Sequence, residues 1–275
     1  MITQIATPES WVEWLTRYLA RETAGSRPAT TRNLRSYHLR RFAHSAERAP
    51  ADVTSDDIQD HINNPDWSPG YRRSVLGSLR SFYRWARRAG LIVLDPAEDA
   101  PSITVPLTKP RPASDEAIEA GNGASDPRVP LMIRLGNEAG MRCCEIAQVH
   151  SRDVIGRPGQ YLLLVHGKGG RDRTVPLSDE LARILLDFGG YVFAGRINGH
   201  LSSSYVSKLI SRAMGHLGTG HQLRHRAGTD WLEASGGNLR VAQELLGHAS
   251  VATTQIYTLI NDDQLRNAVQ SRKAA

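Results

Sequence analysis

Six side chains in the second half of the sequence could together cleave a phosphodiester. In chain order they are Arg142, Lys168, His221, Arg224, His248 and Tyr257. A phenol is a poor nucleophile at neutral pH, so a nucleophilic tyrosine needs cations and proton-transfer partners around it. Guanidinium groups can fork onto phosphate oxygens, an ammonium can protonate a leaving alkoxide, and imidazoles can donate hydrogen bonds or accept a proton. These groups therefore predict phosphoryl transfer to a tyrosine. No carboxylate cluster suited to Mg²⁺ accompanies them, so we expect no metal and no cofactor.

Four short strings carry these residues. They read Gly-Met-Arg-Cys-Cys-Glu-Ile (140–146), His-Gly-Lys-Gly-Gly-Arg (166–171), His-Gln-Leu-Arg-His (221–225) and Leu-Gly-His-Ala-Ser-Val-Ala-Thr-Thr-Gln-Ile-Tyr (246–257). In this order, and with His248 nine residues before Tyr257, they closely resemble the tyrosine recombinases, the phage integrase family. The resemblance runs from about Trp11 to the C-terminus and is strongest after Arg142.

The resemblance implies a role for each of the six residues. Tyr257 attacks duplex DNA and forms a 3′-phosphotyrosyl enzyme with a free 5′-hydroxyl. Two arginines and a histidine stabilise the phosphorane: Arg142, Arg224 and His248. Lys168 protonates the leaving oxygen, and His221 accepts the phenolic proton. The partners implied are double-stranded DNA core sites and further copies of the chain, which form a tetramer on two DNA sites.

Neighbouring residues have supporting or competing interpretations. Glu145 is expected to orient the catalytic groups. Cys144 stands where the family usually has a small hydroxyl residue, so we expect a buried thiol there that makes a weaker hydrogen bond. His225, four residues after His221, could suggest a zinc pair, but no third ligand of suitable spacing follows, and we expect a buried structural histidine.

Three of the six have ordinary structural alternatives. Arg142 could form only a surface salt bridge with Glu145, and His248 could be a histidine that caps a helix end. Lys168 could be an exposed turn lysine. The chain has only four lysines among its 34 basic residues, however, and uses one at this turn, where a titratable proton could reach a leaving oxygen.

Composition fits a soluble DNA-binding enzyme of ordinary size. The chain has 275 residues, 40% of them hydrophobic, and its net charge of +6 makes a polyanion a plausible partner. The two cysteines, 143 and 144, are adjacent and provide no disulfide scaffold. We expect a reducing cytoplasm, that of a bacterial host or its nucleoid if a phage encodes the protein, and no membrane span.

The pattern along the chain predicts a mainly α fold with a small β-sheet (α+β), in two domains. Residues 1–100 are expected to form a helical core-site DNA-binding domain with helices over 8–23, 30–47, from Asp52, and over 69–90. The proline-rich segment 101–113 is expected to be an extended linker. Residues 114–275 are expected to form the catalytic domain. Its predicted elements are helices from Ser114 and over 128–139, 202–217, 222–235 and 239–246, and a hairpin of 161–166 with 173–177.

The helix over 69–90 carries a basic stripe opposite its apolar side. The stripe consists of Arg73, Arg80, Arg84 and Arg87, with Gly77 in its middle, where a backbone could approach closely. We expect these arginines to contact DNA; the alternative is a solvated basic surface.

The expected function is site-specific recombination by a phage or mobile-element integrase. The alternatives are a Xer-type resolvase of chromosome or plasmid dimers, a type IB topoisomerase, and a non-catalytic DNA-binding regulator. The sequence opens on the core-binding helices, which favours a simple integrase or a Xer-like enzyme and leaves the need for a directionality factor open. The amphipathic tail over 261–275 is expected to dock on a neighbouring protomer.

Overall fold

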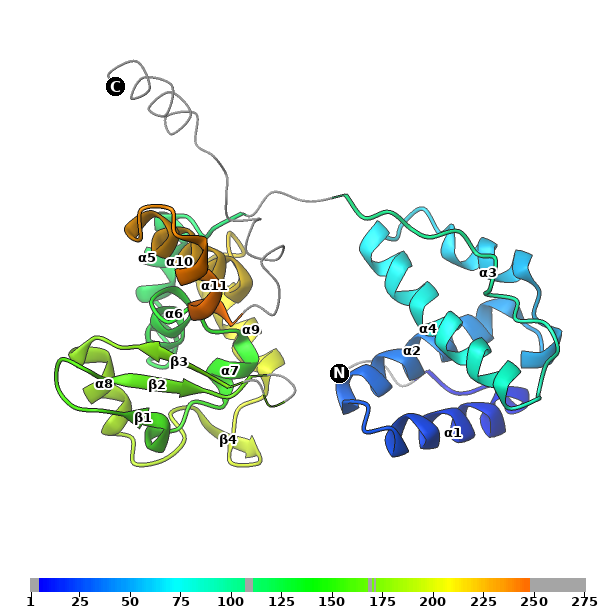
Figure 1. Cartoon of the computed structure of the whole chain (residues 1–275), viewed down its shortest axis with the longest axis horizontal. Helices are drawn as coiled ribbons and strands as arrows, with labels where there is room; N and C mark the ends of the chain where they lie inside the picture. Colours follow the sequence, from blue (N-terminus) through cyan, green and yellow to red (C-terminus); the bar gives the residue numbers. More distant parts are fainter. Residues whose placement is uncertain (1–4, 107–110, 168–169, 171, 248–275) are drawn as a thin grey trace, which may run out of the picture. The chain divides into compact units, whose positions relative to one another are not determined.

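The computed structural model of the chain describes residues 5–106, 111–167, 170 and 172–247. The chain divides into two compact units, Met1–Leu107 and Thr108–Ala275 (Figure 1). The first unit is helical and the second adds a small antiparallel sheet to its helices, which confirms the predicted fold class. Three predicted catalytic residues, Lys168, His248 and Tyr257, and the tail over 261–275 lie outside the described residues.

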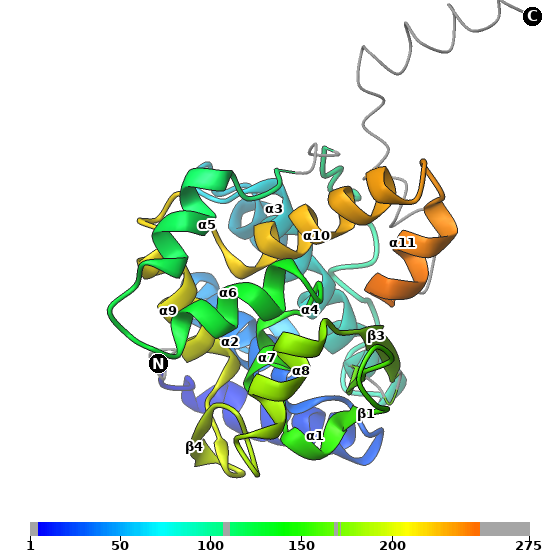
Figure 2. The ribbon, with the colours of Figure 1, turned by 90° about the vertical axis from the view of Figure 1, so that its left-hand side faces the viewer.

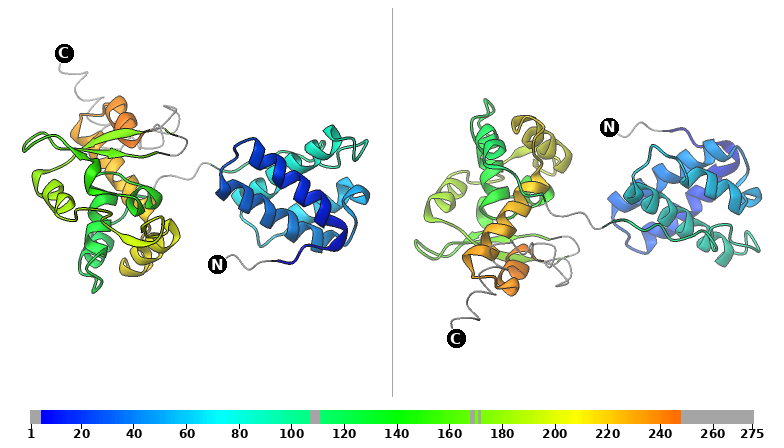
Figure 3. Two further views of the ribbon diagram at one scale, coloured as in Figure 1. Left: turned by 90° about the horizontal axis from the view of Figure 1, so that it is seen from below. Right: turned by 90° about the horizontal axis from the view of Figure 1, so that it is seen from above.

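Over residues 5–106, the N-terminal unit contains four α-helices whose starts are encoded locally. They are α1 (Glu9–Ala24), α2 (Ala29–Ala46), α3 (Ser55–Ile62) and α4 (Pro69–Arg88), with a short 3₁₀ turn at Pro50–Asp52. Pro8 and Pro28 precede the first two helices, where proline's fixed φ suits a helix start. Thr54 and Asp57 form a capping box at α3, and Ser68 caps α4. Helix α2 packs against α1, α3 and α4, and Figure 3 shows α1 and α2, in blue, side by side.

An aromatic core holds these helices together. The Trp11 and Phe82 rings stack with centroids 5.5 Å apart, and Phe42 meets Trp11 edge-on. The Trp11 indole N–H donates to the Arg48 carbonyl at 2.8 Å, so the buried ring keeps its polar group satisfied. The predicted apolar side of α4 is buried as expected: Val75, Leu79, Phe82, Tyr83 and Ala86.

The helices of the C-terminal unit surround one large core. They are α5 (Asp115–Asn122), α6 (Val129–Asn137), α7 (Cys143–Ala147), α8 (Asp179–Leu186), α9 (Ser203–Ala213), α10 (Gly220–Ala234) and α11 (Leu239–Leu246). Helix α10 packs against α6 and α11, as Figure 2 shows, and α9 packs against α7. This packing brings the start of α7 near the start of α10, although about 80 residues separate them in sequence.

Three strands form an antiparallel sheet in the order β1-β2-β3. They are β1 (Val154–Ile155), β2 (Leu162–Val165) and β3 (Arg173–Pro176), and a separate short strand β4 covers Ala194–Ile197. In the register of β2 and β3, Val165 pairs with Arg173. The β2–β3 hairpin confirms the sequence prediction, whereas β1 and helix α8 were not predicted.

The segment between the units begins and ends against their cores. Residues 101–106 and 111–114 have neither helix nor strand. Ile103 packs on the N-terminal core, and Ala113 is buried in the C-terminal one. The Ala113 amide also donates to the Gln222 carbonyl at 3.0 Å. Within the described parts of both units, none of the helices has the length and apolar character needed to cross a membrane.

Candidate active site

Three of the six predicted catalytic residues are described, and two of them, Arg142 and Arg224, lie around one buried carboxylate. Arg142 stands at the start of α7, and His221 and Arg224 lie in the first turns of α10. Glu145 accepts from the Arg142 guanidinium at 2.7 Å and lies 3.9 Å from that of Arg224. Both guanidiniums act electrostatically on His221. The fold therefore places two cations around Glu145 and an imidazole within electrostatic reach of both.

Arg142 is held at its backbone and reaches outward. Its backbone N–H donates to Glu145 at 2.9 Å, while Nη1 donates to the other carboxylate oxygen. The side chain is still 42% exposed. A guanidinium fixed on one edge and open on the other can still offer N–H groups to a phosphate, which a merely structural salt bridge does not require.

Glu145 carries a permanent negative charge. Burial raises the pKa of Glu145, but the hydrogen bonds and charge of Arg173, together with those of Arg142, outweigh this effect and lower it to about 2. Both Nη atoms of Arg173 fork onto its carboxylate at 3.0 and 2.9 Å. An ionised, hydrogen-bonded carboxylate orients cations and does not exchange protons at neutral pH. These contacts support the predicted orienting role.

Arg224 is buried, with 1% of its surface exposed. One terminal nitrogen donates to the Gly140 carbonyl and the other to the Leu246 carbonyl. Gly140 has φ +58°, and a Cβ there would come within 2.6 Å of the Trp231 ring, so only glycine fits this turn. Arg224 thereby ties α10 to the turn that precedes Arg142 and to the end of α11.

His221 has the protonation state that a proton acceptor requires. Its side chain reaches solvent, yet desolvation lowers the pKa of His221, and the charges of Arg224 and Arg142 lower it further. A neutral imidazole at pH 7 can accept a proton from a phenol. The His221 ring meets the His225 ring edge-on, with the two ring centroids 4.2 Å apart. His225 is buried, as predicted, and burial, followed by the charges of His221 and Arg224, lowers the pKa of His225 to about 4.

The prediction for Cys144 is wrong. Cys144 is exposed, and its neighbour Cys143 is the half-buried thiol. Helix α7 is a short helix that turns Cys143, Glu145 and Ile146 inward, so the position between them faces solvent. A Cβ on Gly220 would lie 2.4 Å from the Cys143 sulfur, which shows how tightly this thiol fills the space at the start of α10. Burial raises the pKa of the Cys143 thiol.

The structure adds two residues that the sequence did not single out. Arg173 forks onto Glu145 from the start of β3. His166, the residue after β2, lies between Asp153 at 3.3 Å and Asp172 at 3.1 Å, so it links the end of β2 to the residue just before β3. Burial lowers the pKa of His166, but hydrogen bonds with Asp153 and Asp172 outweigh this and raise it. The sequence offered one indirect signal for Arg173. Glu145 was expected to orient catalytic groups, and a carboxylate that becomes buried in such a role needs a cation beside it.

The basic stripe of α4 is only partly free. Arg73, Arg84 and Arg87 are exposed, and Gly77 has nothing within 4 Å of where a Cβ would stand. Arg80 is half-buried and donates to the carbonyls of Ala97 and Ala100, and Arg87 pairs with Glu98 at 2.5 Å. Four arginines from the end of α4 line a hollow of about 530 Å³ with Asp95, Ala97 and Glu98: Arg80, Arg84, Arg87 and Arg88.

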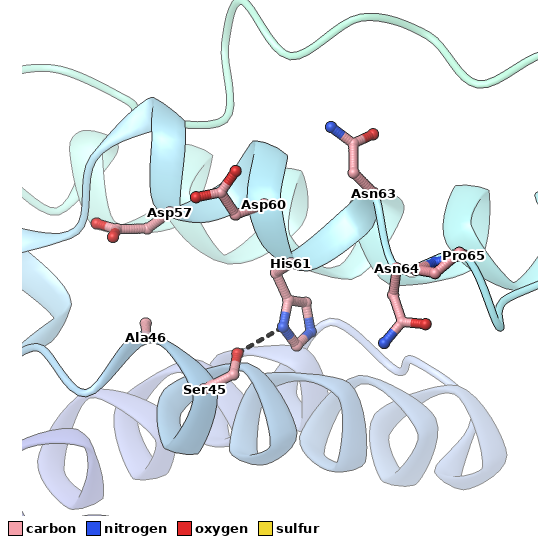
Figure 4. A pocket seen from close by; sticks show the side chains of 8 residues that line it. All are labelled: Ser45, Ala46, Asp57, Asp60, His61, Asn63, Asn64 and Pro65. Atoms are coloured by element: carbon pink, nitrogen blue, oxygen red, sulfur yellow. Dashed lines mark hydrogen bonds between the residues drawn. The ribbon is translucent and has the colours of Figure 1, made fainter.

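A second hollow of about 460 Å³ lies between α2 and α3 of the same unit (Figure 4). It is lined by polar groups, among them Asp57, Asp60 and His61, and the His61 ring is hydrogen bonded to Ser45 at 2.5 Å. Over the described ranges, no group of three or more histidines, cysteines and carboxylates is arranged to hold a metal ion. This hollow therefore provides no metal site.

Comparisons with known proteins show which family the chain resembles. A model of the phage integrase family matches residues 115–264. The chain is 34% identical to tyrosine recombinase XerD of Pseudomonas aeruginosa over 78% of its length and 80% of that protein's. Tyrosine recombinase XerD of Rhizobium meliloti is 28% identical over 90% of this chain and 91% of its own.

A solved structure shows the same fold. The crystal structure of a lambda integrase (75–356) dimer bound to a COC′ core site superposes with a TM-score of 0.73 at 21% identity, covering 89% of this chain and 94% of that one. The family match spans more than half of the chain and contains the whole cluster around Glu145. The chain belongs to the tyrosine recombinase (phage integrase) family and is a site-specific DNA recombinase, an enzyme that cleaves and rejoins DNA strands.

Proposed function

We propose that this recombinase cuts DNA with Tyr257 through a 3′-phosphotyrosyl intermediate. The observation that carries the proposal is the placement of Arg142 and Arg224 around Glu145, with the imidazole of His221 within electrostatic reach of both guanidiniums. The family match over 115–264 also contains the other three residues of the predicted set, which lie outside the described part of the chain. Two cations and a neutral imidazole are the surroundings that a phenol nucleophile needs.

Each bond change has an assigned residue. The Tyr257 oxygen attacks phosphorus, and its proton passes to His221, whose lowered pKa keeps the ring neutral at pH 7. The P–O5′ bond breaks, and Lys168 gives a proton to the departing oxygen. Charge on the non-bridging oxygens of the phosphorane is stabilised by Arg142, Arg224 and His248. The phosphotyrosine conserves the bond energy, so the reverse attack by a 5′-hydroxyl needs no ATP and no metal.

The N-terminal unit is proposed to bind the core site through α4. Arg73 and Arg84 are exposed on a helix whose other side is fully packed, and positively charged groups neutralise DNA phosphates irrespective of sequence. The predicted division into a core-site domain over 1–100 and a catalytic domain over 114–275 follows from this assignment.

Strand exchange sets the number of protomers. Each chain has one Tyr257, and exchange between two duplexes cuts four strands, so a tetramer on two DNA sites is the assembly we propose. The tail over 261–275 has three apolar residues among polar ones, Leu265, Ala268 and Val269. A segment of this kind gains stability by docking, and we propose a neighbouring protomer as its partner.

The biological role has two candidates. Similarity to two XerD proteins favours a Xer-type resolvase, which joins sites within dimeric chromosomes or plasmids. The family model and the fold shared with lambda integrase also fit a phage or mobile-element integrase. Sequencing the DNA that becomes covalently bound in the native host separates them: a single site within the host's own chromosome or plasmid indicates a resolvase, and a junction between mobile and host DNA indicates an integrase.

The mechanism is tested with Tyr257→Phe, which removes only the hydroxyl. A DNA site is first selected by binding from a random-sequence pool, and a nick near the cleavage point lets the cut fragment diffuse away and traps the adduct. The unmodified protein should give a protein–DNA band that survives denaturant, and Tyr257→Phe should bind with unchanged affinity but give no band. A denaturant-stable band from the variant would remove Tyr257 from the role of nucleophile.

A further inference from the structure

Two guanidiniums occupy the last carbonyls of α11. Arg173 Nε donates to the Leu245 carbonyl at 2.9 Å, and an Nη of Arg224 donates to the Leu246 carbonyl. Carbonyls in the final turn of a helix have no partner inside the helix and need one from elsewhere. Arginine side chains at this end also interact favourably with the helix dipole. The end of α11 is therefore fastened by side chains from β3 and α10.

The other edge of Arg173 reaches the catalytic cluster. Its two Nη atoms fork onto Glu145, the carboxylate that also holds Arg142, and the Arg173 and Glu145 side chains are 8% and 2% exposed. One planar group thus connects the support of Arg142 to the end of α11. A lysine has the same charge but cannot bond the carboxylate at two points and a carbonyl at a third.

Gly247 leaves the space that this connection needs. It ends α11 in the left-handed conformation with φ +63°, and a Cβ there would stand 2.8 Å from Cδ of Arg173. Gly236, in the turn before α11, has a similar φ of +66° but nothing within 4 Å of its Cβ position. A side chain at Gly247 would meet both backbone strain and Arg173, whereas one at Gly236 would meet only the strain.

We propose that Arg173 is a positioning residue for cleavage. It fixes the end of α11 relative to Arg142, and the sequence continues from that end through Gly247 directly to His248 and then to Tyr257. Its effect on cleavage rests on the function proposed above. Its anchoring of α11 does not, and the two can be measured separately.

The first test replaces Arg173 by lysine and compares it with Arg134→Lys. Arg134 also bonds two carboxylates, Glu138 and Glu180, but at the surface of α6. In Arg173→Lys we expect hydrogen exchange at the backbone amides of 239–247 to accelerate at least ~10-fold, as expected for losing hydrogen bonds to charged groups. Cleavage of the nicked duplex should fall ~10- to 100-fold with unchanged DNA affinity. Arg134→Lys should change neither.

The second test covers the case in which Arg173→Lys fails to fold. Gly247→Ala keeps Arg173 but forces the two apart, and Gly236→Ala introduces similar backbone strain without the collision. Gly247→Ala should reproduce the faster exchange at 239–247 and the slower cleavage, and Gly236→Ala should not. Where both single variants fold, the double variant should lose less cleavage rate than the product of the two single fold-reductions. Both changes disturb the same contact, between Arg173 and the end of α11.

The outcomes separate the two proposals. The claim that Arg173 fastens the end of α11 fails if hydrogen exchange at 239–247 is equally fast in Arg173→Lys and Arg134→Lys. It also fails if exchange there is equally fast in Gly247→Ala and Gly236→Ala. Faster exchange with normal cleavage overturns the positioning role. A third outcome is faster exchange in the variants together with no covalent adduct from the unmodified protein. That result would keep the role of Arg173 in fastening α11 and would reject the phosphotyrosyl mechanism.

Discussion

Lys168 has a single chemical task in the proposed mechanism, to protonate a strongly basic 5′-alkoxide. Replacing the bridging oxygen by sulfur turns the leaving group into a thiolate, which needs no acid because its conjugate acid is far stronger. Lys168→Ala should therefore cut ordinary DNA ~100-fold or more slowly and cut the 5′-phosphorothiolate at close to the unmodified rate. Single-turnover cleavage of the two matched substrates measures the difference.

Arg142→Ala is the control for sulfur rescue. Charge on the non-bridging oxygens develops whichever atom leaves, so this variant should be slow on both substrates. Rescue of both variants, or of neither, would make Lys168 a phosphate clamp or a turn lysine and assign the proton to another group, with His221 or a water next in line.

Single residues also show where sequence reasoning reached its limit. Arg142, His221 and Arg224 were predicted together because each stands in a short string whose spacing carries the chemistry. The structure brings Arg142 and Arg224 to Glu145 and places His221 within electrostatic reach of both guanidiniums. Arg173 could not be predicted, because its partner lies 28 residues away and is reached only when β3 has paired with β2 in the folded unit. The error at Cys144 has a similar origin: adjacent positions on a helix point about 100° apart, and the sequence does not say which of the two thiols turns inward.

Helix α4 combines two kinds of arginine on one stripe, and salt dependence should tell them apart. Arg84 is exposed, so Arg84→Gln should lower the slope of log affinity against log salt by about one. Arg80 holds the Ala97 and Ala100 carbonyls, so Arg80→Gln should mainly lower the free energy of unfolding, by about 1 to 3 kcal/mol, because it leaves those carbonyls without their donor.

Arg17 on α1 supplies the matched control for both variants. It is exposed, pairs at 3.3 Å with Glu13 one turn earlier on the same helix, and lies outside the α4 stripe. Arg17→Gln should leave the slope and the stability nearly unchanged. If Arg84→Gln and Arg17→Gln give equal slopes of log affinity against log salt, the α4 stripe is a solvated surface that does not contact DNA.

Helices were the most predictable elements, since their ends are encoded locally. Ser114, Ser202 and Thr54 each cap the helix that follows, and apolar periodicity gave the buried sides. Strand β1 was missed because two residues have no period to detect. Its existence depends on pairing with β2, whose Leu163 lies opposite Val154. Pairing across the sheet is a tertiary contact, which local sequence does not specify.

Two histidines of the N-terminal unit should make the stability of that unit depend on pH. In the N-terminal unit, burial, followed by the charge of Arg41, lowers the pKa of both His38 and His61 to about 4. Because these values lie below the ordinary 6.5, the unfolded chain binds more protons between the two values. The contribution of both histidines to stability is present above pH 6.5 and is lost as the pH falls toward 4.

Tryptophan fluorescence can follow this unit alone. Four of the five tryptophans are in it, at positions 11, 14, 67 and 85, so Trp231→Phe removes the signal of the other unit. Urea midpoints of that variant should fall between pH 7 and pH 4.5, and additional replacement of His38 and His61 by asparagine should flatten the dependence. A midpoint equally sensitive to pH without the two imidazoles would assign the effect to other groups.

The chain enters the C-terminal unit through residues that are bonded directly to α10. The Ala113 amide is bonded to the carbonyl of Gln222, the residue after His221, and Arg226 pairs with Asp115 at 2.6 Å. Tension along the polypeptide that enters this unit is thus borne first by α10, the helix that carries His221 and Arg224. A force that displaces residues 111–115 is therefore transmitted to the first turns of α10, where His221 and Arg224 lie.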